Sequence, residues 1–157
     1  MPRTTETIEF TIEDRAEVVA VVDGWPADRA GWVNFEPIVH PDDRPPAPGR
    51  FRVFSVMGRT VPLCTWSPPE PGGRGPRYVS LGIQHGLGAR LVPRLTELGL
   101  APDTRWRVLS DHPKRGMVVA VPPDDDADAV TAWLLRAGEA VCPVPHRGWR
   151  AAINRLA

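Results

Sequence analysis

The sequence has few cysteines and no long apolar run, and each absence narrows the classes of protein to consider. Cys64 and Cys142 are the only cysteines and form no C-x-x-C pair. The first ten residues, MPRTTETIEF, contain no apolar segment or cleavage pattern, so we expect no signal peptide and a cytoplasmic location. In that compartment both thiols are expected to be free. No apolar run approaches a membrane span, so no membrane partner is expected.

Composition is otherwise that of an ordinary soluble protein, with many stiff loops. Apolar residues make up 42% of the 157 residues and charged residues 24%, which is typical of globular domains. The 19 prolines and 14 glycines exceed average usage. A chain of this length is enough for one compact domain over 1–157. The loop at 67–77, SPPEPGGRGPR, allows a sub-division into a β-rich half, 1–66, and a second half, 78–157.

Charge is balanced overall but unevenly distributed. Residues 1–48 carry four basic and ten acidic side chains, whereas residues 49–121 carry eleven basic and four acidic ones. Only one of the basic residues, Lys114, is a lysine. An arginine-rich middle segment could offer an anion-binding face if folding keeps its cations together. The alternative is that the acidic segment packs beside it and neutralises it.

The first half is predicted to be rich in strands. Apolar residues alternate or cluster with β-branched side chains in five segments. These are 7–13, 17–22, 32–39, 50–58 and 60–66. The last two are separated by Gly58-Arg59, a tight hairpin signal. Pro37 should place the third segment at a sheet edge or a bulge, because proline cannot donate a ladder hydrogen bond.

The second half is predicted to be a β-α-β-β-α unit. A strand at 78–83 precedes a helix at 89–98, and a hairpin formed by 106–111 and 117–122 follows. A second helix starts after an N-cap at Asp124, and the tail from 147 adds a short helix. A strand, a helix and a further strand normally form a right-handed parallel crossover. We therefore predict an α+β fold with a mixed sheet, in which a β-rich N-terminal half packs with this unit.

The stretch GIQHGLGARL, residues 82–91, carries the strongest chemical signal. Gly86 and Gly88 allow a sharp turn whose backbone N–H groups could bind an anion at the start of the helix. His85 precedes them and could titrate near neutral pH. The alternative interpretation is that the glycines only bend the chain between strand and helix.

The hairpin tip is expected to face this glycine loop. If the two flanking strands are parallel, both end at the same edge of the sheet, where open α/β sheets bind ligands. Asp111 and His112 follow the second strand, and Lys114 and Arg115 add positive charge. His85, His112 and Asp111 are thus the candidate catalytic groups, with a histidine as general acid or base. An exposed tip of this composition is also an ordinary solvated turn.

Sharper motifs are absent. The glycine loop is neither a Walker A loop nor a dinucleotide-binding fingerprint, and none of the four serines sits in G-x-S-x-G. Cys142 and His146 are four residues apart, but an extended Pro-Val-Pro between them would separate them by roughly 12 Å. Such a distance prevents them from sharing a zinc ion. We therefore expect no metal and no cofactor.

Nucleic-acid binding is a further interpretation. Seven arginines fall on or beside predicted strands: Arg50, Arg52, Arg59, Arg74, Arg77, Arg105 and Arg107. With Trp66, Tyr78 and Trp106 nearby, they could bind a single strand by charge and stacking. The six tryptophans are also explained as packing residues. In a third interpretation, the acidic segment 1–48 forms a surface for a protein partner.

Together these patterns predict a protein that binds a small anionic ligand, bearing phosphate or carboxylate, at the glycine loop. The alternative is a module that binds a protein partner or nucleic acid and has no catalytic activity. Whether the chain is an enzyme stays open, because no motif assigns a reaction or a family.

Overall fold

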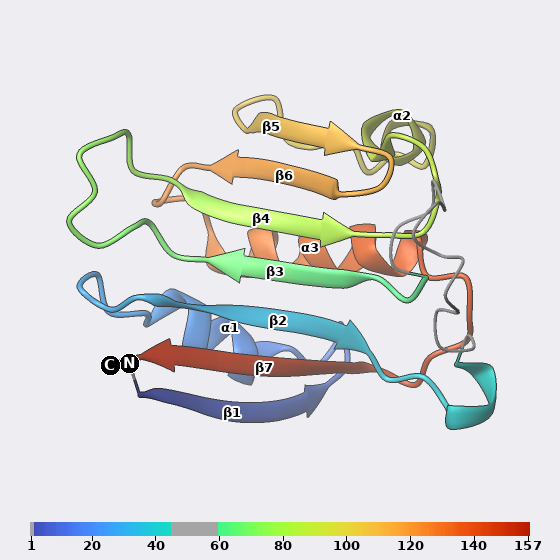
Figure 1. Ribbon diagram of the computed structural model, residues 1–157, viewed down its shortest axis with the longest axis horizontal. Coiled ribbons are helices and arrows are strands. Elements are labelled where there is room, and N and C mark those ends of the chain that lie inside the picture. The colour runs from blue at the N-terminus through green and yellow to red at the C-terminus, as the bar shows by residue number, and fades with distance from the viewer. Residues whose placement is uncertain (1, 45–59) are drawn as a thin grey trace.

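The computed structural model describes residues 2–44 and 60–157, and within them the chain forms one sheet backed by helices (Figure 1). The elements in chain order are β1 (Arg3–Phe10), α1 (Ala16–Asp23), β2 (Gly31–Pro37), the 3₁₀ turn η1 (Pro41–Asp43), β3 (Leu63–Ser67), β4 (Val79–Gln84), α2 (Leu91–Glu97), β5 (Arg107–His112), β6 (Gly116–Val121), α3 (Ala127–Ala140) and β7 (Trp149–Leu156). Helices α1 and α3 lie on the same face of the sheet.

The predicted mixed sheet is wrong, whereas the α+β class is confirmed. Among the described residues the strand order is β1-β7-β2-β3-β4-β6-β5, and every neighbouring pair is antiparallel. The β5–β6 hairpin folds back so that β6 lies between β4 and β5. Strands β4 and β5 therefore run in the same direction without pairing. The crossover through α2 exists, but it spans a strand instead of creating a parallel pair.

Two segments have the opposite secondary structure to that predicted. The run at 17–22 is helix α1, and its buried residues, Val18 and Val22, are four positions apart on one face. Its β-branched composition is typical of strands, but burial against the sheet outweighs that preference. The tail from 147, expected to be a helix, is strand β7, in which Trp149 and Ile153 are buried by alternation.

Strand β2 is central, although its proline predicted an edge or a bulge. It pairs with β7 on one side and with β3 on the other. Pro37 is its last residue, so the missing N–H group falls where the ladder ends. The strand expected at 50–58 and the turn at Gly58-Arg59 lie outside the described residues.

The helices of the second half form close to their predicted places. Helix α2 begins at Leu91, which puts Pro93 in the first turn, where a proline is tolerated. Helix α3 begins two residues later than predicted. Its N-cap is Asp126, not Asp124, and the Asp126 carboxylate accepts a hydrogen bond of 2.9 Å from the Ala129 N–H. None of the helices in the described residues is long and apolar enough to cross a membrane.

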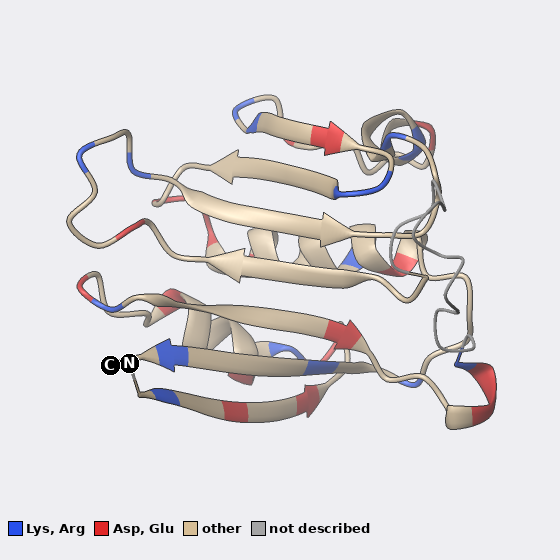
Figure 2. Ribbon diagram, viewed as in Figure 1, with Lys and Arg blue, Asp and Glu red and all other residues tan. Residues whose placement is uncertain are grey.

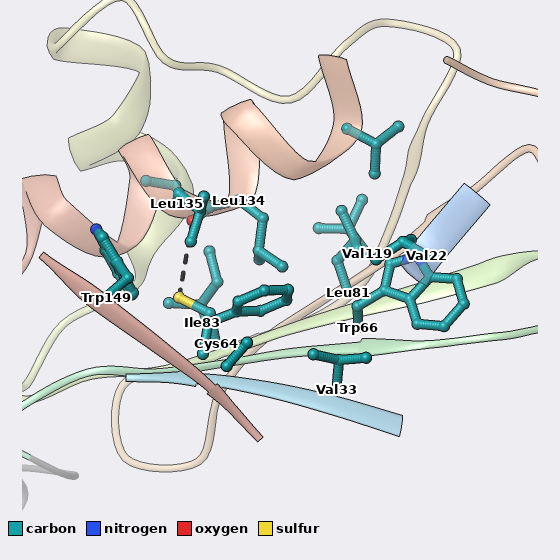
Figure 3. Packing of buried hydrophobic residues seen from close by; sticks show 14 of the residues in the cluster. Val22, Val33, Cys64, Trp66, Leu81, Ile83, Val119, Leu134, Leu135 and Trp149 are labelled. Atoms are coloured by element: carbon teal, nitrogen blue, oxygen red, sulfur yellow. Dashed lines mark hydrogen bonds between the residues drawn. The ribbon is translucent and has the colours of Figure 1, made fainter. Parts of the chain in front are cut away.

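The core lies between the sheet and the helices (Figure 3), and α3 lies close to the sheet at Gly138. A Cβ atom at this position would lie 2.5 Å from Cys64 Sγ and 2.8 Å from Trp149 Cη2. Only glycine therefore permits this approach. Cys64 is fully buried and free, and its burial raises the pKa of its thiol far above the ordinary range. Cys142 is also a free thiol.

Candidate functional site

His85 follows β4 directly and is only 1% exposed. Its Nδ1 accepts a hydrogen bond of 3.3 Å from the Leu87 N–H. In the neutral ring the proton is then on Nε2, which is buried and finds no partner among the described residues. Burial lowers the pKa of His85, and the negative charge of Asp111 partly offsets that effect. The histidine thus presents one unsatisfied donor.

Asp111 belongs to β5, and its carboxylate caps the start of α2. Its Oδ1 accepts from the Leu91 N–H at 2.7 Å and its Oδ2 from the Val92 N–H at 2.9 Å. A carboxylate at this position satisfies two free N–H groups and interacts favourably with the helix dipole. The protein's own side chain therefore engages donors that the sequence analysis assigned to a bound anion. Strands β4 and β5 both end on this side of the sheet, near the start of α2, because each is antiparallel to β6.

The hairpin tip is organised by His112. Its Nδ1 accepts from the backbone N–H groups of Lys114 and Arg115, both at 3.1 Å. The side chains of Lys114 and Arg115 are exposed, and no acidic partner contacts them in the described part of the chain. The structure therefore brings His85, Asp111 and His112 to the side of the sheet where β4 and β5 end. The Asp111 carboxylate faces α2 and not solvent.

Several residues of the nucleic-acid interpretation have other roles. Trp66 is buried and packs against Trp25 with a centroid distance of 5.4 Å. Trp106 donates to Asp125 Oδ2 at 2.6 Å. Arg105 binds the carboxylates of Asp103 and Asp125, each at 3.1 Å. These groups therefore already have partners within the protein.

Arg74, Arg77 and Arg107 are exposed, as is the ion-paired Arg105. Tyr78 is half-buried beside a cavity in the β3–β4 loop. The remaining three, at 50, 52 and 59, lie outside the described residues. The described part of the set therefore supplies no surface on which arginines and exposed aromatic rings alternate.

The edge of the sheet at β5 is a second candidate site that the sequence analysis did not identify. Four large hydrophobic side chains are 39–43% exposed in the described residues: Leu87, Leu98, Val108 and Leu109. All four fall in the segment that comprises the glycine loop, α2 and β5. Exposed basic residues flank β5, as Figure 2 shows. The sequence signal is the apolar pair Val108-Leu109, which the predicted strand at 106–111 contains without marking it as a surface.

A third candidate lies near the start of β7. His146 and Trp149 line a small cavity there, and each has a buried nitrogen without a partner among the described residues. Cys142 Sγ donates to the Val144 carbonyl at 3.4 Å. In the described ranges, 2–44 and 60–157, no cluster of three or more His, Cys, Asp or Glu side chains could hold a metal ion.

Comparison with known proteins adds no constraint on these sites. No protein-family model, no curated protein and no solved structure matches the chain.

Proposed function

We propose that this chain binds a protein partner through the edge strand β5, to which an extended segment of the partner adds as a further strand. The observation that carries the proposal is the location of the exposed hydrophobic residues. Val108 and Leu109 of β5 are 39% and 41% exposed. The other two large hydrophobic side chains of similar exposure in the described residues, Leu87 and Leu98, lie in the glycine loop and at the end of α2 and are not part of the strand. Exposed apolar groups gathered in one segment are typical of interaction surfaces.

The backbone of β5 supports this mode of binding. Strand β5 is the last strand of the sheet among the described residues, so one row of its N–H and C=O groups faces away from β6. The register shifts between Val108 and Ser110, which leaves Leu109 unpaired at a bulge. A partner strand would bond to the outer row of backbone groups and cover the two apolar side chains.

The charge around β5 indicates the chemistry of the partner. Arg107, Lys114 and Arg115 are exposed and have no acidic partner in the described part of the chain. Arg105 differs, because two carboxylates already bind it. An extended segment that alternates apolar and acidic residues would match both the apolar and the basic groups, and charge complementarity would set its orientation.

The test uses short synthetic peptides and amide NMR spectra of the protein. A peptide in which valine alternates with glutamate is expected to shift the β5 amide resonances and to leave those of β1 unchanged. A peptide with lysine in place of glutamate should bind at least about tenfold more weakly. A peptide interrupted by proline should not bind, because it lacks the ladder donors. Shifts at β1, or none anywhere, would contradict the proposal.

Two variants test whether the peptide binds the edge of β5 or any exposed hydrophobic side chain. Leu109→Glu places a charge on β5 and should abolish binding of the acidic peptide. Leu98→Glu adds the same charge to a leucine of similar exposure, 43% against 41%, at the end of α2. It should retain most of the binding. An equal loss of affinity in both variants would show that the peptide binds exposed apolar side chains in general and not the edge of β5.

A small anion bound at His85 is the second candidate function, because the buried Nε2–H of this residue has no partner in the described residues. Binding to the native state would raise the melting temperature in inorganic phosphate. The increase should disappear in His85→Leu. A response that persists in that variant would place the anion elsewhere. A cytoplasmic location belongs to the same proposal and is checked by cell fractionation.

A further inference from the structure

A cavity of about 330 Å³ lies in the loop that joins β3 to β4, at the end of the sheet opposite the glycine loop. The loop spans 68–78, whereas a hairpin between adjacent strands needs only about 2–5 residues. It extends beyond the ends of both strands (Figure 1). The cavity shares no residue with the β5 edge or with His85, so this site is independent of the functions proposed above.

A turn fixes the first part of the loop. The Gly73 N–H donates to the Glu70 carbonyl at 3.2 Å, with Pro71 and Gly72 between them. Proline restricts φ at the first central position, and Gly72 has the positive φ, 71°, that a type II turn requires at the second. Further prolines in the same loop restrict its backbone. A ligand would therefore meet walls that are largely preformed, which lowers the entropy cost of binding.

Two side chains of opposite charge line the cavity. Glu70 lies on the limb that leaves β3 and Arg77 on the limb that enters β4, and Figure 2 shows the loop red on the first limb and blue on the second. The Glu70 carboxylate lies beside Gly73, another wall residue, since its Oε2 would be 3.7 Å from a Cβ atom there. Glu70 and Arg77 are exposed, and neither has an ion-pair partner in the part of the chain that the structure describes. Both charges can therefore pair with a ligand.

The rest of the wall combines hydroxyl groups with apolar surface. Tyr78 and Ser80 flank Val79, whose side chain is buried in the core. Because side chains alternate along a strand, Ser80 lies on the face of the sheet that α1 and α3 leave uncovered (Figure 1). Pro68 and Pro76 add ring carbons to the wall. Such a wall can contact an apolar side chain of a ligand and still offer hydrogen bonds.

We propose that this cavity binds a small zwitterion, which carries both an ammonium and a carboxylate group. The ammonium would pair with the Glu70 carboxylate, and the carboxylate would pair with the Arg77 guanidinium, whose planar fork suits it. A simple anion would be attracted by Arg77 and repelled by Glu70, and a simple cation would experience the reverse. Only a ligand with both charges gains from both walls.

The volume of the cavity indicates the size of the zwitterion. About 330 Å³ is at the lower end of the roughly 300–1,000 Å³ typical of small-molecule sites. A free α-amino acid and a dipeptide both belong to this size class, and both carry the two charges. The charges are farther apart in the dipeptide, so the relative affinities of the two compounds distinguish these sources.

The test titrates the full chain with L-phenylalanine and follows the amide resonances by NMR. Gly73 and Gly75 line the cavity, so their resonances are expected to shift while those of β5 stay unchanged. N-Acetyl-L-phenylalanine lacks the ammonium and L-phenylalanine amide lacks the carboxylate, so each should bind at least about tenfold more weakly. Glycyl-L-phenylalanine is the dipeptide probe, and whichever zwitterion binds more tightly identifies the source. Equal affinity for the single-charge compounds, or no shift with either zwitterion, overturns the proposal.

Variants that remove one charge test each wall separately. Glu70→Gln should weaken binding of L-phenylalanine roughly tenfold, but it should not weaken N-acetyl-L-phenylalanine, which has no ammonium to pair. Arg77→Gln should weaken L-phenylalanine to a similar extent without weakening L-phenylalanine amide. Both positions are exposed, so both variants should fold. If either variant weakened the zwitterion and its single-charge analogue equally, the assigned pairing would be wrong.

Arg74→Gln is the matched control. Arg74 is an exposed arginine of the same loop, but it does not line the cavity. Its replacement should leave the affinity for L-phenylalanine unchanged. An equal loss of affinity in Arg74→Gln and Arg77→Gln would mean that the ligand responds to the positive charge of the loop in general, and it would overturn the proposed site.

Discussion

The two edges of the sheet are built in opposite ways. Strand β1 pairs with β7 along all eight of its residues without a register shift. Two ion pairs cover this edge, Glu6 with Arg155 at 3.1 Å and Glu9 with Arg150 at 3.0 Å. Strand β5 has a bulge and exposes apolar side chains. Its carboxylate, Asp111, is bonded to α2 and does not shield the edge.

This difference indicates which edge is available to another chain. Charged side chains on an edge strand oppose pairing with a further strand, since the incoming chain would have to desolvate them. On the β1 edge these charges form ion pairs, whereas β5 carries one exposed charge, Arg107, which has no acidic partner among the described residues. Each of the following predictions alters one edge and compares the result with the other.

The largest effect is expected from Asp111→Ala, which removes the cap of α2. Two N–H groups lose their acceptor and the helix loses a favourable charge, so the free energy of unfolding should fall by about 2–3 kcal/mol. Urea denaturation measures the loss. Hydrogen exchange should accelerate in α2 and β5 while the β1 amides stay protected. Glu9→Gln at the opposite edge is the control and should change stability by less than about 1 kcal/mol.

Removing the acidic side chains of β1 should reduce stability less than Asp111→Ala does, but it should increase self-association more. In the double variant Glu6→Val, Glu9→Val, the loss of two exposed ion pairs should cost no more than about 1 kcal/mol. The strand then reads RTTVTIVF, with threonine and apolar residues and no acidic residue, and we expect it to pair with other chains. Sedimentation velocity should detect oligomers that the parent chain does not form. A monomeric double variant would mean that these charges do not protect the edge.

The smallest effect is a pH dependence confined to the β5 side. Burial lowers the pKa of His85 in the folded state, although Asp111 opposes the shift. The unfolded chain then binds a proton first as the pH falls below about 6.5, so stability is full above that pH and declines below it. Urea midpoints near neutral pH and near pH 5 measure the decline. His85→Gln should flatten it, whereas an unchanged slope would assign the decline to other groups.

The parts of the fold that could be predicted are those in which local pattern and tertiary environment agree. Helix α3 has an apolar stripe and an acidic start, and it forms where expected within two residues. The strand predicted at 17–22 was wrong because the β-branched residues there are typical of strands. The helix forms because Val18 and Val22, four positions apart, are both buried on one face. The helix predicted for the tail from 147 was wrong. This segment is strand β7, and its alternation of buried and more exposed residues depends on the pairing with β1 and β2 on either side.

The candidate site likewise has one part that the sequence predicts and one part that it does not. That His85 and Asp111 would reach one edge followed from chain direction, which the hairpin preserves even though the strands do not pair. The role of Asp111 as a helix cap could not be predicted, since it depends on a contact across nineteen and twenty positions. His146 was considered in the sequence only as a zinc ligand, and Trp149 only as a packing residue. That each has a buried nitrogen without a partner in the described residues depends on the packed neighbours and could not be read from the sequence.

Strand β7 has a consequence for the synthesis of the protein. It lies between β1 and β2, so β1 has no neighbouring strand, and β2 has only β3, until the ribosome has delivered the chain as far as Leu156. At roughly 5–20 residues per second, β1 remains without that neighbour for on the order of ten seconds after it emerges. The glutamates and threonines that cover its edge in the finished sheet would also keep the nascent strand soluble during that interval.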